Sequence, residues 1–246
     1  MSVRSINWYK YAAPANFYAL AGRMIPSLTG ITAVLFIMGL YLSFFVAPTD
    51  FQQGEAYRII FIHVPAAWMG MFLYVLMAVY AGLGWAFNAR LASMMATAIS
   101  TTGAVFTFIS LVTGALWGRP AWGVYWVWDA RMTSTLILMF LYVGFISLQS
   151  SIDDPRRADR AGAVLALVGL INIPIIYFSV QWWNSLHQGA TIRIANKPTM
   201  APTMLAAMLI LLAACWMYSI AVVLVRVRCI IREREREAPW LAEALA

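Results

Sequence analysis

Six long stretches without a charged side chain dominate this sequence and limit what it can fold into. Each is longer than the roughly 20 apolar residues that an α-helix needs to cross a bilayer. Every charged residue falls outside them, as expected where an ionised group in the hydrocarbon core is costly. The stretches are 24–49, 59–89, 91–118, 132–152, 161–192 and 198–225.

The composition agrees with a chain embedded in a membrane. Hydrophobic residues make up 63% and charged residues 11% of the 246 residues, whereas a soluble domain is about half apolar and about a quarter charged. This excludes a soluble enzyme and a disordered chain. We predict an all-α integral membrane protein, a single domain over 1–246, with transmembrane helices at approximately 24–47, 60–87, 92–116, 132–151, 161–183 and 202–225.

The distribution of Lys and Arg predicts the orientation of these helices. Twelve of the 17 lie on the side of the N-terminus and five on the opposite, outer side. Since Lys and Arg accumulate in cytoplasmic segments, we predict that both termini and the charged tail 226–246 are cytoplasmic. The net charge of +7 follows from this bias and does not indicate nucleic-acid binding, for which the sequence has no module.

The outer loop 117–131, between the third and fourth spans, is unusually rich in tryptophan. It holds Trp117, Trp122, Trp126 and Trp128, four of the eleven tryptophans. An interfacial aromatic belt explains one or two at each helix end. Gly118, Pro120 and Gly123 argue against a regular helix through its first half. Two interpretations stay open here, namely a belt and a flat platform for a large apolar ligand.

The chain has only two histidines, His63 and His187, and both are predicted near the outer face. They can be two unrelated interfacial residues. A metalloporphyrin would explain them together with the tryptophans, because its iron takes an imidazole on each face and indoles can cover the apolar disc. Its propionates would need cations, and the outer side supplies Arg58, Arg119, Arg131 and Arg193.

Asp129 ends the tryptophan-rich loop. We expect it to cap the N-terminus of the fourth span, and it can also pair with Arg131 or orient an imidazole. The spans themselves hold no carboxylate, lysine or arginine, which argues against a proton pump, an ion channel or most secondary transporters. No Walker motif is present, so we expect no ATP hydrolysis by this chain.

Three segments resemble the haem-handling proteins of cytochrome c maturation. The stretch WGRPAWGVYWVWDARMTS (117–134) resembles their tryptophan-rich WWD motif, with Met132 where Leu is expected. HVPAAW (63–68) and SLHQGAT (185–191) resemble the two histidine segments that flank it in the CcmC family, the haem exporter protein C family. Other WWD proteins, the CcmF and CcsA-type families, are larger and have more spans and additional histidines.

The resemblance implies a multi-pass protein of the bacterial inner membrane that binds haem b non-covalently on the periplasmic face. It would present this haem to the chaperone CcmE, in an ABC-type complex with CcmA, CcmB and CcmD. The implied axial ligands of the haem iron are His63 and His187. The implied platform and chaperone-facing surface are Trp117, Trp122, Trp126, Trp128 and Asp129, and the implied propionate or loop-ordering cations are Arg58 and Arg131.

Three other functions stay open at this point. The chain itself could promote covalent attachment of haem to the chaperone, as a lyase-like enzyme, although we expect a delivery component. It could carry haem across the bilayer, or it could be a structural subunit without a cofactor. Since imidazole must be neutral to ligate iron, we expect haem binding to weaken as the pH falls through roughly 6.

Overall fold

The computed structural model describes residues 8–183, 185–187 and 200–245, and these residues are mostly helical, with no strand among them. Short helical turns at Trp8–Ala12, Leu42–Val46 and Glu55–Ile59 precede or follow the longer helices. The α-helices are α1 (Pro14–Tyr41), α2 (Ile60–Phe87), α3 (Arg90–Trp122), α4 (Ala130–Ser151), α5 (Pro155–Gly169), α6 (Asn172–Trp182), α7 (Pro202–Arg234) and α8 (Pro239–Leu245).

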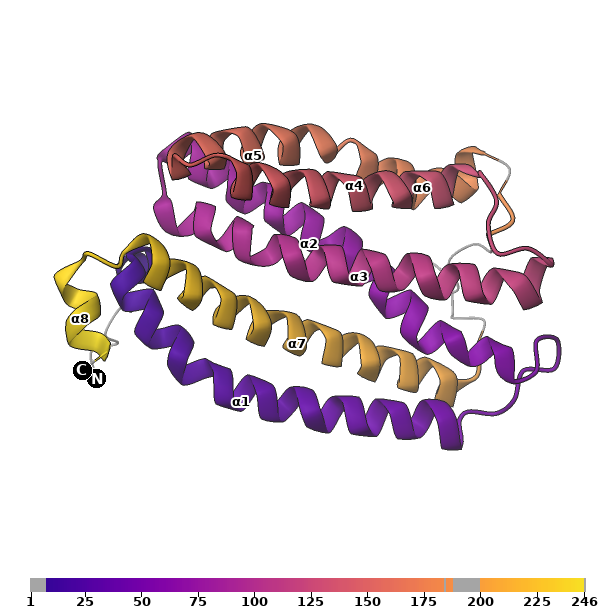
Figure 1. Cartoon of the computed structure of the whole chain (residues 1–246). Coiled ribbons are helices and arrows are strands. Elements are labelled where there is room, and N and C mark those ends of the chain that lie inside the picture. The colour runs from indigo at the N-terminus through magenta and orange to yellow at the C-terminus, as the bar shows by residue number, and fades with distance from the viewer. Residues whose placement is uncertain (1–7, 184, 188–199, 246) are drawn as a thin grey trace, which may run out of the picture.

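Six helical segments are long and apolar enough to cross a membrane, which confirms the all-α six-span prediction. The fifth of them combines α5 and α6. The long helices run side by side, with α1 packed along α7 and α2 packed along α3 (Figure 1). α1 begins and α7 ends at one end of the bundle (Figure 1). At the opposite end, which we call the histidine end, α2, α4 and α7 begin and α3 and α6 end.

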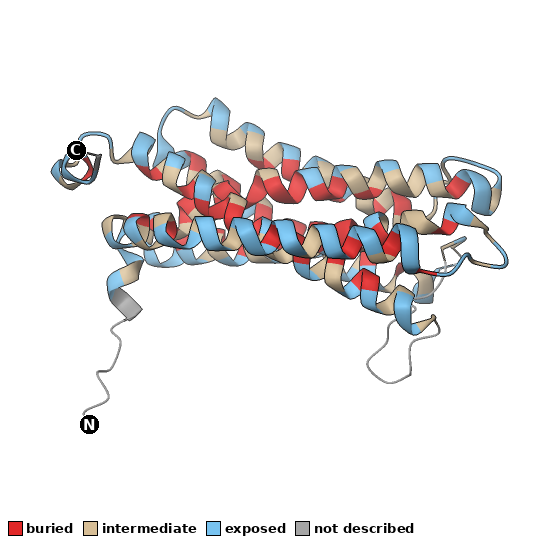
Figure 2. Ribbon diagram, turned by 90° about the horizontal axis from the view of Figure 1, so that it is seen from below, coloured by how far each residue is buried: buried red, intermediate tan, exposed pale blue. Residues whose placement is uncertain are grey.

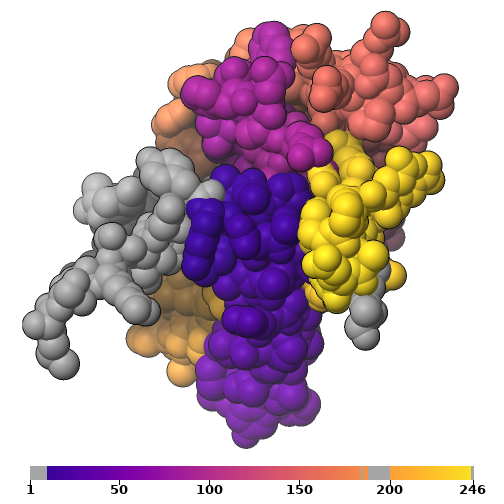
Figure 3. All heavy atoms as spheres, turned by 90° about the vertical axis from the view of Figure 1, so that its left-hand side faces the viewer, coloured from indigo at the N-terminus to yellow at the C-terminus, as the bar shows by residue number. Residues whose placement is uncertain are grey.

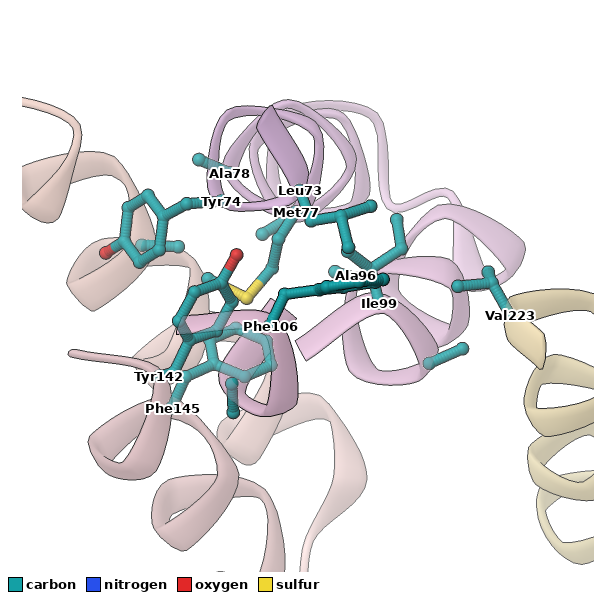
Figure 4. Packing of buried hydrophobic residues seen from close by; sticks show 14 of the residues in the cluster. Leu73, Tyr74, Met77, Ala78, Ala96, Ile99, Phe106, Tyr142, Phe145 and Val223 are labelled. Carbon is teal, nitrogen blue, oxygen red and sulfur yellow. The ribbon is translucent and has the colours of Figure 1, made fainter. Parts of the chain in front are cut away.

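The core lies between the helices, while their outward faces are exposed and apolar, as a lipid environment requires (Figure 2). Large side chains from α2 and α4 fill its centre, among them Tyr74, Met77 and Tyr142 (Figure 4). The Tyr142 hydroxyl donates a hydrogen bond to the Gly70 carbonyl oxygen at 2.8 Å. A buried hydroxyl in this apolar interior therefore has the partner that it needs.

The fifth span is broken in the middle, where the sequence predicted one continuous helix over 161–183. The amides of Leu170 and Ile171 bond three residues back instead of four, and Pro174 has no amide hydrogen to donate. Asn172 fixes the break, since its buried carboxamide donates to the Ser134 carbonyl oxygen of α4 at 2.8 Å. α6 consequently packs along α4 at the histidine end.

Two other boundaries also differ from the sequence prediction. α3 continues to Trp122, so the first half of the expected loop 117–131 is helical. Gly118 does not break the helix but is buried where a Cβ atom would come within 2.9 Å of the Val124 carbonyl oxygen. Gly123 ends α3 in the left-handed conformation, with φ of 81°. At the other end of the bundle, α7 extends to Arg234, well into the predicted tail.

Gly103 on α3 offers a test of this packing. A Cβ atom there would overlap the Tyr142 ring, which is fully buried and cannot move aside. We expect Gly103→Ala to destabilise the fold by about 1–3 kcal/mol, the usual cost of overpacking. Thermal unfolding in detergent would measure this. Gly30→Ala is the matched control, because nothing lies within 4 Å of a Cβ atom there; equal unfolding temperatures for the two variants would contradict the packing described.

Candidate functional site

A cavity of about 810 Å³ lies at the histidine end, between α2, α3, α4, α6 and α7. This volume lies within the range typical of small-molecule and cofactor sites. Most of its wall is apolar, and its polar groups are few. Of the residues singled out from the sequence, the cavity brings together His63, Trp117, Trp122, Arg131 and His187.

His63 lies in the first turn of α2 and is held against α3. Its Nδ1 atom lies 3.1 Å from the Thr113 hydroxyl oxygen, and that hydroxyl donates its own proton to the Ile109 carbonyl oxygen at 2.6 Å. With its proton on the Ile109 carbonyl, the hydroxyl can accept from Nδ1–H, an arrangement that leaves the lone pair of the imidazole on Nε2. Gly114 leaves room for the ring, since a Cβ atom there would come within 2.9 Å of His63 Cε1.

His187 lies in the segment that follows α6 and is held by Asp129. Its Nδ1 atom is 3.5 Å from Asp129 Oδ2, which is longer than a normal hydrogen bond, and this buried Nδ1 has no closer hydrogen-bond partner among the described residues. Ser185 joins the two, because its hydroxyl donates to the same carboxylate oxygen and accepts from the His187 backbone amide at 3.1 Å. A proton on Nδ1, which faces the carboxylate, would leave the lone pair of His187 on Nε2.

Asp129 has a second role as the N-cap of α4. Its Oδ1 atom accepts a hydrogen bond from the Met132 amide at 2.8 Å. Burial would raise the pKa of this carboxyl, but the hydrogen bonds from Ser185 and Met132 outweigh burial and lower the pKa. Both expected roles, the cap and the orientation of an imidazole, are thus present, whereas Asp129 forms no ion pair with Arg131 in the described part of the chain.

The four tryptophans of the loop divide into two pairs. Trp117 packs edge-on against His63, with ring centroids 5.8 Å apart, and its Nε1 donates to Gln53 at 2.7 Å. Trp122 packs against His187, with centroids 4.9 Å apart. Trp126 and Trp128 pack on each other instead, with centroids 5.4 Å apart and no part in the cavity wall. Trp128 is 74% exposed.

The two arginines expected to serve the site have different surroundings. Arg131 lines the cavity, and its one described hydrogen bond is a long one of 3.4 Å to the Ile176 carbonyl oxygen. Arg58 does not line the cavity. It donates to the carbonyl oxygens of Ser43 and Ala47 and to Glu55, so its contacts match the ordering of the loop between α1 and α2. Of the other two candidates, Arg119 donates to the Gly123 carbonyl oxygen and does not line the cavity, and Arg193 lies outside the described residues.

Several residues of the site were not predicted from the sequence. Thr113 and Gly114 precede Trp117 by four and three residues, so helical periodicity along α3 places them on the same face. Ser185 lies two residues before His187, a short-range spacing at which a hydroxyl often bonds a backbone amide. Gln53 comes from the segment between α1 and α2, and no local pattern indicates it. Trp68, the last residue of the segment 63–68, also lines the cavity.

Comparison with known proteins decides the family. The family model for CcmC, heme exporter protein C, matches residues 7–242. The chain belongs to the heme exporter protein C family. Heme exporter protein C of Escherichia coli K12 is 43% identical over 237 residues, 96% of each chain. That of Bradyrhizobium diazoefficiens is 52% identical over 182 residues, 74% of this chain and 68% of its own.

A relative from a plant extends the similarity beyond bacteria. The putative cytochrome c biosynthesis ccmC-like mitochondrial protein of Marchantia polymorpha is 47% identical over 179 residues. The match covers 73% of this chain and 76% of that protein. The name of this relative refers to cytochrome c biosynthesis.

In this heme exporter protein C family member, Asp129 can be tested as the residue that orients His187. We expect Asp129→Asn to weaken haem binding by about ten- to hundredfold, the usual effect of losing a residue that orients a metal-ligating histidine. Asn retains the helix cap, so the fold should be kept. Asp154→Asn is the matched control, because Asp154 caps α5 and contacts no histidine. Haem titration followed by the Soret band would measure both affinities, and equal affinities would contradict the role of Asp129.

The pH dependence of haem binding gives a second test. Burial lowers the pKa of His187, and the positive charge of Arg131 lowers it further, against the opposing effect of Asp129. A histidine ligates iron only as the neutral imidazole. If His187 is a ligand, as the sequence predicts, we expect affinity to be constant from pH 8 to about 6.5, the ordinary histidine pKa, and to fall only at lower pH. Titrations between pH 4.5 and 8 would show this. A decline that begins above pH 7 would contradict it.

Proposed function

We propose that this protein binds haem b non-covalently between His63 and His187 and presents it to the chaperone CcmE during cytochrome c maturation. The observation that carries the proposal is that both histidines of the chain line one cavity, although they are 124 positions apart in the sequence. The name of the family supports haem as the cargo, and the name of the plant relative supports the pathway.

The wall of the cavity fits a porphyrin in three respects. Nδ1 of His63 contacts the Thr113 hydroxyl and Nδ1 of His187 faces Asp129, so Nε2 of each imidazole is the atom that would ligate iron. Trp117 and Trp122 supply flat apolar surface next to these imidazoles. Arg131, which has no carboxylate within 4 Å among the described residues, supplies a cation for a propionate. We therefore assign the propionate contact to Arg131 and a structural role to Arg58.

The two proposed ligands are held with different firmness, which would suit the transfer of haem to a chaperone. His63 is fixed by the packing of α2 on α3, whereas His187 is held by Asp129 and Ser185 in a segment outside the helices. Withdrawing a loop ligand disrupts fewer packed contacts than moving a helix. Exposed Trp128 and Tyr125 lie in the loop that follows Trp122, so they would offer an apolar surface to CcmE beside the haem.

The positive-inside distribution of Lys and Arg supports the orientation. With both termini cytoplasmic, the histidine end faces the periplasm of a bacterial inner membrane. The absence of a nucleotide-binding motif from the sequence leaves ATP hydrolysis to partners, for which we propose the family's CcmA and CcmB, with CcmD as the small subunit. A lyase-like role would use the same orienting residues, and we favour delivery over catalysis.

Absorption spectra of the purified protein in mild detergent test the haem site directly. We expect a low-spin haem spectrum in the wild type, because two imidazoles form a strong axial field. His63→Ala and His187→Ala should each change the spectrum and weaken haem binding by at least about tenfold, since each removes an axial ligand. A wild-type protein without a Soret band after haem addition would overturn the proposal.

A further inference from the structure

A second, smaller cavity lies at the end of the bundle opposite the histidines. Its volume is about 120 Å³, the space of a few water molecules at roughly 30 Å³ each. It can admit a phosphate-sized group but not a large ligand. α7 and α8 lie directly against α1 at this end (Figure 3). The lining residues are Tyr18 and Ile25 of α1 and Val225, Arg228, Cys229 and Arg232 of α7.

Arg228 is held between Tyr18 and Gly22 of α1. Its guanidinium lies 4.2 Å from the centroid of the Tyr18 ring, a cation–π contact. Trp240 of α8 packs edge-on against the same ring, with centroids 6.0 Å apart. Gly22 of α1 makes room for the guanidinium, since a Cβ atom there would come within 3.1 Å of Arg228 Cζ. The charge is therefore fixed at the cavity rather than free to extend into solvent.

The arginines of this cavity lack the partners that their neighbours have. Arg90 pairs with Glu235 and Arg234 with Asp159, each at 2.8 Å. In the described part of the chain, neither Arg228 nor Arg232 has a carboxylate within 4 Å, and the buried Nε of Arg228 has no hydrogen-bond partner there. A buried donor without a partner is costly, so an external acceptor at this cavity would be stabilising.

The polarity of the wall changes along the helix axis. Arg228 and Arg232 lie toward the end of the bundle, whereas Ile25 and Val225 lie toward its middle. Val225 is 44% exposed and Cys229 is also exposed, so this side of α7 faces the surroundings of the bundle. A phospholipid has the same layering, with a phosphate above an acyl chain. An acidic peptide would match the arginines but not the apolar part of the wall.

We propose that this cavity binds the phosphate of an anionic phospholipid, such as phosphatidylglycerol, from the adjoining leaflet. Arg228 and Arg232 donate charge-assisted hydrogen bonds to the phosphate oxygens, and the acyl chain lies along Ile25 and Val225. Inorganic phosphate has the same headgroup chemistry and is the alternative source of the ligand. The site is independent of the haem cavity, because the two share no lining residue.

Native mass spectrometry of the full chain in detergent, titrated with phosphatidylglycerol or phosphatidylcholine, tests the proposal. We expect at least about tenfold tighter retention of phosphatidylglycerol, equivalent to a single strong contact. Arg228→Gln and Arg232→Gln should reduce retention to the level of phosphatidylcholine. Arg156→Gln is the matched control, since Arg156 is exposed and lies outside the cavity, and it should retain phosphatidylglycerol as the wild type does.

Three outcomes would overturn the assignment. They are equal retention of the two lipids by the wild type, undiminished retention of phosphatidylglycerol by both cavity variants, and an equal loss in Arg156→Gln. Inorganic phosphate that binds as tightly as the lipid and displaces it would assign the site to free phosphate. Arg232 is exposed, so its variant should fold even if Arg228→Gln does not. Haem titration of each variant separates this site from the haem cavity.

Discussion

The exclusion of charge from the hydrocarbon core is the constraint on which this structure depends. It sends every Lys, Arg, Asp and Glu to the ends of the six spans, so any ionic chemistry has to take place there. Within the spans, two buried polar side chains are satisfied by carbonyl oxygens of neighbouring helices, the Tyr142 hydroxyl by Gly70 and the Asn172 carboxamide by Ser134. Each bond joins two helices, α4 to α2 and α6 to α4.

Asp129 connects the start of α4 to the segment that carries His187. One carboxylate both starts α4 and holds the segment that carries His187. The position of a ligand in a loop thereby becomes tied to the position of a helix end. His63 needs no such device, since α3 supplies Thr113 and the space above Gly114. The two proposed ligands are thus held differently. His63 is fixed by the packing of two helices, whereas His187 is held by the contact of its segment with Asp129. This difference would suit transient binding of haem.

The spans could be predicted because lipid imposes a long, uniform apolar pattern, which local sequence shows directly. The break in the fifth span could not, because it depends on the bond between Asn172 and a carbonyl of another helix. The helical end of α3 was missed for a related reason. Gly118 resembles a helix breaker in sequence, but in the structure it lies within α3, where its missing side chain leaves room for the Val124 carbonyl oxygen. Pro120 lies in the last turn of α3, where the loss of one backbone hydrogen bond has little effect on the helix.

The sequence by itself determined the number of spans, the unequal charge of the two sides, and the pairing of two histidines with a tryptophan-rich segment. Only the tertiary structure decided which of these residues meet. Trp117 and Trp122 line the cavity while Trp126 and Trp128 do not, and Arg131 lines it while Arg58 supports a loop. The physical reason is that a cavity between five helices depends on side-chain directions in segments far apart along the chain, which no local pattern encodes.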